Sequence, residues 1–167
     1  ERSTESHSKM SDGVHTSGTP SHQRRSPAET AFGSLRFGAE HGVIEMAKQL
    51  QAAMDEDGVD LRIIDMLAGG DIDKEVFENI KYAETFLVFG SKRYGQDTGN
   101  QASTFYESKF AHSNKKRMIL IRMVPYVNGS ADFNELQAQI LFGMNNLELY
   151  WEVGTPMPPE LPAQIME

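Results

Sequence analysis

The feature that most constrains the fold is a pair of short, almost continuous apolar runs, TFLVF at residues 85–89 and MILIRM at residues 118–123. Runs of this length and composition are typical of strands that are covered on both faces. The stretch between them, near residues 102–113, is predicted to be a helix. Because a helix between two buried strands returns the chain to the same end of the sheet, the sequence predicts parallel strands.

Weaker patterns extend this alternation to five strands, each followed by a helix. Further strands are predicted at residues 30–36, 61–64 and 147–151, and further helices at 40–55, 71–80, 133–144 and 158–165. The predicted fold class is therefore α/β, a flavodoxin-like five-stranded parallel sheet with helices on both faces. Ligands of such sheets bind at the carboxyl ends of the strands, which selects the loops at 34–42, 65–72 and 90–102 as candidate site segments.

The amino-terminal part of the chain has a different composition from the rest. Residues 1–28 are dominated by Ser, Thr, His, Gly, Pro and charged residues, and such a segment buries too little apolar surface to offset its ordering entropy. We therefore expect a disordered linker at 1–28 and one domain at 29–167, whose last helix is expected to be truncated. The chain begins at Glu1, so we expect it to be a piece of a longer protein.

Charge and composition argue against several classes of partner. The net charge of −8 does not favour a nucleic-acid binder, and no apolar stretch approaches the roughly 20 residues that a membrane-spanning helix needs. The chain has no cysteine, which excludes disulfides, thiol catalysis and cysteine metal sites within it. The histidines show no metal-ligand spacing, so no metal site is predicted. We expect a cytoplasmic protein with neither nucleic acid nor membrane as a partner.

Several common functions of this fold lack their motifs here. A phosphate-accepting receiver domain needs clustered acids after the first strand, where this chain has SLRF at residues 34–37. A dinucleotide fingerprint G-x-G-x-x-G and a nucleophile elbow G-x-S-x-G are also absent from the sequence. A flavodoxin-type phosphate loop would need more hydroxyl groups than Ser34 supplies.

The motifs that remain resemble the TIR (Toll/interleukin-1 receptor-like) domain family over residues 30–165. The matching segments are AFGS at 31–34, Asp65 to Asp71, FLVFGSKRY at 86–94, Glu107, and 117–125. Two positions depart from the family pattern, since Ser103 and Thr104 stand where Trp and Cys are frequent. Leu35 also replaces a frequent Tyr or His.

The resemblance implies an NAD⁺ glycohydrolase in which Glu107 is the catalytic residue. One carboxylate could suffice, because nicotinamide leaves NAD⁺ as a neutral molecule and needs no proton from a second acid. The remaining demand is electrostatic stabilisation of an oxocarbenium-like ribose, and a position near a helix N-terminus is expected to keep Glu107 ionised. The alternative is structural, because Thr104 and Glu107 also fit a T-x-x-E capping box.

The other candidate site residues follow from the same loops. Ser34, Arg36, Phe37, Asp65, Ser91 and Tyr94 are predicted to contact the nucleotide. Arg36 suits phosphate and Phe37 suits stacking, whereas ordinary loop packing is the competing explanation for all of them. NAD⁺ would be a substrate, with no permanently bound cofactor.

The resemblance also implies partners. Self-association, or contact with other TIR domains through the 65–72 loop, would serve a signalling or immune-type response. Two readings of the function remain open, an NAD⁺-cleaving domain and a non-catalytic TIR interaction or adaptor module. A third is a related nucleotide-binding or nucleoside-processing domain on the same sheet.

Overall fold

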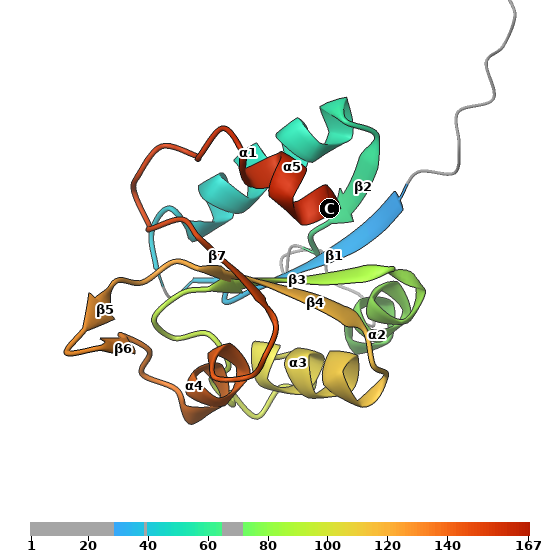
Figure 1. The fold of residues 1–167 in the computed structure, drawn as a ribbon. Helices are drawn as coiled ribbons and strands as arrows, with labels where there is room; N and C mark the ends of the chain where they lie inside the picture. The colour runs from blue at the N-terminus through green and yellow to red at the C-terminus, as the bar shows by residue number, and fades with distance from the viewer. Residues whose placement is uncertain (1–28, 39, 65–71) are drawn as a thin grey trace, which may run out of the picture.

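A computed structural model describes residues 29–38, 40–64 and 72–167, and its centre is one parallel sheet (Figure 1). The five strands are β1 (Glu29–Leu35), β2 (Val59–Arg62), β3 (Thr85–Gly90), β4 (Arg117–Arg122) and β7 (Leu147–Tyr150), in the order β2-β1-β3-β4-β7. All four pairings between neighbours are parallel. This is the flavodoxin-like order, and the predicted fold class is confirmed.

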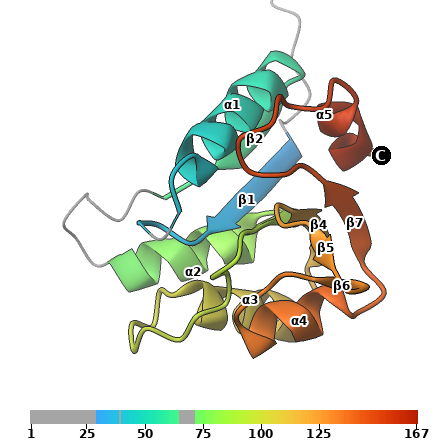
Figure 2. The same cartoon turned by 90° about the vertical axis from the view of Figure 1, so that its left-hand side faces the viewer.

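In the described part of the chain, five helices in total cover the two faces of the sheet. The helices α1 (Val43–Glu56) and α5 (Leu161–Met166) lie on one face, and α2 (Ile72–Tyr82), α3 (Thr104–Ser113) and α4 (Leu136–Phe142) lie on the other, as Figures 1 and 2 show from two directions. Each layer encloses its own apolar core. The central strand β3 is buried along its whole length, as its apolar run predicts.

Alternation along β1 decides which residues face which layer. Ala31 and Leu35 pack into the core under α1, whereas Phe32 packs into the core under α2 and α3. By the same period of two, Ser34 faces the α3 layer. Space at Gly33 is tight, since an added Cβ would lie 3.1 Å from Ile63 and 3.2 Å from Phe89, and these side chains would have to shift slightly.

The sequence prediction missed a two-stranded hairpin. β5 (Tyr126–Val127) and β6 (Ser130–Ala131) pair antiparallel around Asn128 and Gly129, which have φ values of 51° and 83°. Positive φ at both central residues is the signature of a type I′ turn, for which Asn-Gly is the preferred pair. The dipeptide was therefore the signal that could have revealed the hairpin.

Several element boundaries differ from their predicted positions. β2 starts at Val59, because Val59 and Leu61 alternate into the core directly after the turn at Gly58. The helix α3 starts at Thr104 and not at 102. The last helix starts at Leu161, whose N–H bonds to the carbonyl of Pro158, so the two consecutive prolines precede the helix and do not open it.

Candidate functional site

The candidate site lies where β1 and β3, neighbours in the sheet, end. The chain leaves β1 towards α1 on one face and leaves β3 towards α3 on the other. Divergence of two crossovers in this way opens a crevice at the carboxyl ends of the strands. The loops after β1 and β3 therefore supply the side chains of the site, as the fold class predicts.

Glu107 is the centre of a buried chain of polar groups. It lies in the first turns of α3 and is only 7 % exposed. The Ser34 hydroxyl, at the end of β1, donates a hydrogen bond to the Glu107 carboxyl oxygen Oε2. A second hydrogen bond of 2.7 Å joins the Ser34 oxygen to the hydroxyl of Tyr94, which is fully buried. Three residues from separate segments thus meet at one point.

The protonation of Glu107 differs from the sequence-based expectation. Burial raises the pKa of Glu107 from 4.5 to about 8, and the hydrogen bond from Ser34 opposes that rise. The carboxyl is therefore mostly protonated at neutral pH in the unliganded domain. The positive end of α3 favours a carboxylate, but removal of the group from water outweighs this effect. Burial and the nearby Glu107 charge likewise raise the pKa of Tyr94 well above its ordinary value.

The capping alternative for Glu107 is contradicted by the start of α3. The N-cap residue is Ser103, and no side chain caps it. The Thr104 hydroxyl instead accepts a hydrogen bond of 2.9 Å from the backbone N–H of Gly95. The Glu107 carboxyl accepts a hydrogen bond from Ser34 and does not bond back to the helix start, so Glu107 does not form a capping box.

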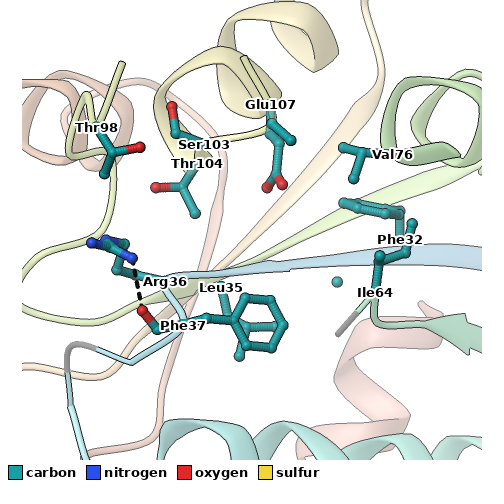
Figure 3. Close-up of a pocket in the computed structure, with 12 residues that line it drawn as sticks. Phe32, Leu35, Arg36, Phe37, Ile64, Val76, Thr98, Ser103, Thr104 and Glu107 are labelled. Atoms are coloured by element: carbon teal, nitrogen blue, oxygen red, sulfur yellow. Dashed lines mark hydrogen bonds between the residues drawn. The ribbon is translucent and has the colours of Figure 1, made fainter. Parts of the chain in front are cut away.

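A small cavity separates Glu107 from the loop after β1. Its volume is about 30 Å³, which holds one or two water molecules. The residues around it are Phe32, Gly33, Leu35, Arg36, Phe37, Ile64, Val76, Thr98, Ala102, Ser103, Thr104 and Glu107. Figure 3 shows the Glu107 carboxyl pointing into this space from α3, with the Phe37 ring on the opposite side.

Two of the predicted contact residues, Arg36 and Phe37, line this cavity directly. Arg36 donates a hydrogen bond of 2.7 Å to the Phe37 carbonyl and weaker ones of 3.4 and 3.3 Å to the side-chain oxygen of Gln96. Gln96, Thr98 and Ser103 were not singled out from the sequence, although they belong to the polar loop after β3. The hydroxyl of Ser103 is buried and has no hydrogen-bond partner among the described residues.

The remaining predicted residues occupy other positions. Ser91 is fully buried, does not line the cavity, and its hydroxyl has no partner in the described part of the chain. Tyr94 does not line the cavity either and reaches the site only through Ser34. Asp65, with the rest of the segment at 65–71, lies outside the described residues, so the predicted partner contacts there have no structural counterpart to compare.

Within the described ranges, no group of three or more His, Cys, Asp or Glu residues could hold a metal ion, and no helix is long and apolar enough to cross a membrane. Comparison of the sequence with models of protein families and with curated proteins found no match. The function is therefore argued from the site itself.

Proposed function

We propose that this domain is a TIR-type NAD⁺ glycohydrolase that cleaves the nicotinamide–ribose bond, with Glu107 as its catalytic residue, and that it acts in signalling through self-association. One observation carries the proposal. A buried carboxyl points into a cavity at the carboxyl edge of the sheet and is held there by Ser34, not by the end of its own helix. A carboxyl kept out of water without an ion-pair partner is costly, and such groups cluster at functional sites.

The proposed reaction makes limited demands on the protein. The C–N bond breaks with its electron pair passing to the nicotinamide ring, which leaves as a neutral molecule, and the ribose carbon becomes cationic. A carboxylate beside that ribose stabilises the developing charge. Water then adds to the carbon and loses a proton, which leaves ADP-ribose.

The protonated resting state of Glu107 fits this scheme if the substrate ionises it. NAD⁺ carries a positive charge on its nicotinamide ring, and an opposite charge within a few ångströms lowers the pKa of a carboxyl group. Binding would therefore release the Glu107 proton to solvent and create the carboxylate where the ribose lies. The described cavity, of about 30 Å³, is too small for a ribose, so its lining must open as the substrate enters.

The test is release of nicotinamide from NAD⁺, measured by chromatography at high protein concentration. We expect the wild type to release nicotinamide and Glu107→Gln to lose at least a hundredfold in rate, about 2.7 kcal/mol of transition-state stabilisation. Gln keeps the size and neutrality of the protonated acid, so this variant should fold. The matched control is Glu75→Gln, an exposed position on α2, which should keep the wild-type rate. Equal release by the wild type and Glu107→Gln would overturn the proposal.

A specific observation also favours the second function, a non-catalytic interaction module. Large apolar side chains are exposed on α4, on the turn that follows it and on β7, namely Leu136, Ile140, Met144, Leu147 and Tyr150. Such residues gathered at a sheet edge suit a protein contact. A domain that self-associates without releasing nicotinamide, and loses self-association on Ile140→Asp, would have this function instead.

A further inference from the structure

Two arginines share a single uncharged acceptor at the edge of the site. Arg36 Nη2 and Arg93 Nη2 lie 3.3 and 3.1 Å from the same atom, the side-chain oxygen of Gln96. Arg36 comes from the loop after β1, and Arg93 comes from the loop after β3. The two guanidinium groups therefore converge from opposite sides of the crevice on one small area.

Neither arginine of this pair forms an ion pair with a described residue. The described part of the chain has five arginines, and Arg62, Arg117 and Arg122 each form an ion pair with a carboxylate. Arg36 and Arg93 form none with a described carboxylate. Two like charges held around a neutral amide repel each other, and an anion bound between them would remove that cost.

The chemistry of the pair favours phosphate over other anions. A guanidinium presents its N–H groups as a planar fork that matches two oxygens of a phosphate group, and two such forks can hold a diphosphate. Arg36 and Glu107 line the same cavity, and Figure 3 shows Arg36 on its Thr98 side. In NAD⁺ the diphosphate is attached to the ribose whose bond is broken. One ribose would therefore lie between Glu107, at the bond that breaks, and the arginines, at the diphosphate.

The surroundings of Arg93 favour phosphate binding on the side of Gln96. Arg93 also lines a second hollow of about 440 Å³, which contains the acidic residues Glu40, Asp132 and Glu152. Lys92 lines it too but forms an ion pair of 2.8 Å with Asp132, so Glu40 and Glu152 still disfavour phosphate there. The Glu40 carboxylate accepts a hydrogen bond of 2.9 Å from the backbone N–H of Arg93, whereas the Arg93 guanidinium turns to Gln96. The uncharged end of a nucleotide would suit this acidic hollow better than its phosphates.

We propose that Arg93 joins Arg36 in a subsite for the diphosphate of the substrate ester, where Arg93 discriminates a nucleoside diphosphate ester from a nucleoside that lacks the diphosphate. This inference rests on the proposed function for the identity of the ester. Arg93 is a new member of the site, since it was not among the residues predicted from the sequence.

Binding of inorganic pyrophosphate, measured by calorimetry at low salt, tests the subsite without any turnover. We expect the wild type to bind pyrophosphate more tightly than orthophosphate, and Arg93→Gln to bind it about tenfold more weakly, as for loss of one charged hydrogen bond. Arg62→Gln removes an arginine whose charge is already paired with Asp60, and it should bind like the wild type. Glu40→Gln removes a nearby negative charge and should tighten binding.

The activity arm compares NAD⁺ with nicotinamide riboside, which lacks the diphosphate. We expect Arg93→Gln to lower the ratio of kcat/KM for NAD⁺ to that for nicotinamide riboside by about tenfold. Pyrophosphate binding that is absent, or equal in the wild type, Arg93→Gln and Arg62→Gln, would overturn the subsite. Intact pyrophosphate binding without nicotinamide release would instead overturn the glycohydrolase and leave the subsite standing.

Discussion

Glu107 is buried beside two hydroxyl groups and has no ion-pair partner among the described residues, so its protonation depends on what enters the cavity. With a pKa of about 8 in the free protein, the carboxylate form grows as the pH rises towards that value. Because kcat/KM reports ionisation of the free enzyme, kcat/KM for NAD⁺ should rise with pH and level off above about 8. The kcat profile should level off at lower pH, since the bound nicotinamide cation lowers the pKa. Initial rates between pH 5.5 and 9.5 measure both profiles.

Ser34→Ala is the matching variant for this pH profile. The hydrogen bond from Ser34 lowers the pKa of Glu107, so its loss should move the kcat/KM profile to higher pH. If Ser34 only packed β1 against α3, the variant would lower stability and leave the profile at its original pH. A flat kcat/KM profile in the wild type would contradict a catalytic carboxyl at this position.

At the scale of single residues, the sequence indicated Glu107 as a candidate site residue but did not indicate its environment. The residue was selected because it falls near the start of a helix after a buried strand, at a position where the family that the sequence resembles has a glutamate. Its contact with Ser34 joins residues 73 positions apart, and the hydroxyl of Tyr94 completes the chain. The raised pKa follows from that burial, so the expectation of an ionised side chain was wrong. Desolvation depends on the packed surroundings, and a local sequence pattern does not contain them.

At the scale of elements, α4 packs closely against the end of β3, where the Phe142 ring lies over Gly90. A Cβ added to Gly90, the last residue of β3, would lie 2.2 Å from Cζ of Phe142 on α4. We expect Gly90→Ala to destabilise the domain by about 1–3 kcal/mol, because the ring or the helix must shift. Urea unfolding followed by circular dichroism measures the change. The double variant with Phe142→Leu should recover part of the loss, and strictly additive effects would show that the two residues do not press on each other.

The predictability of the elements followed the strength of their local signals. The apolar runs at β3 and β4 marked both strands to within one residue. The β5–β6 hairpin was missed, because two-residue strands have no hydrophobic period and only Asn128 and Gly129 carried its signal. The helix α4 was predicted to be longer than its seven residues, since apolar side chains at helical spacing, such as Met144, continue past its end at Phe142. Met144, which lies beyond the end of the helix, is exposed.

At the scale of the whole molecule, the strand order brings separate loops together. The order β2-β1-β3-β4-β7 places the ends of β1 and β3 side by side, and Ser34, Arg36 and Arg93 come from those ends. The parallel sheet, and with it the edge at which the carboxyl ends of the strands meet, was predicted correctly, because buried strands joined by helices allow few arrangements. The sharing of Gln96 by two arginines depends on side-chain directions within the loops, which no periodic pattern encodes.

Stability of the whole domain should depend on pH through the same carboxyl. The pKa of Glu107 is raised from 4.5 to about 8 on folding, so its contribution is fully present below about pH 4.5 and is lost as the pH rises through about 8. A shift of this size corresponds to roughly 5 kcal/mol at most. Glu107→Gln cannot ionise, so the free energy of unfolding of the wild type should fall relative to this variant between pH 5 and pH 9. Urea titrations of both proteins at several pH values give the difference directly, and the other acids of the chain cancel in it. Parallel curves for the two proteins would mean that Glu107 ionises as readily in the folded domain as in the unfolded chain.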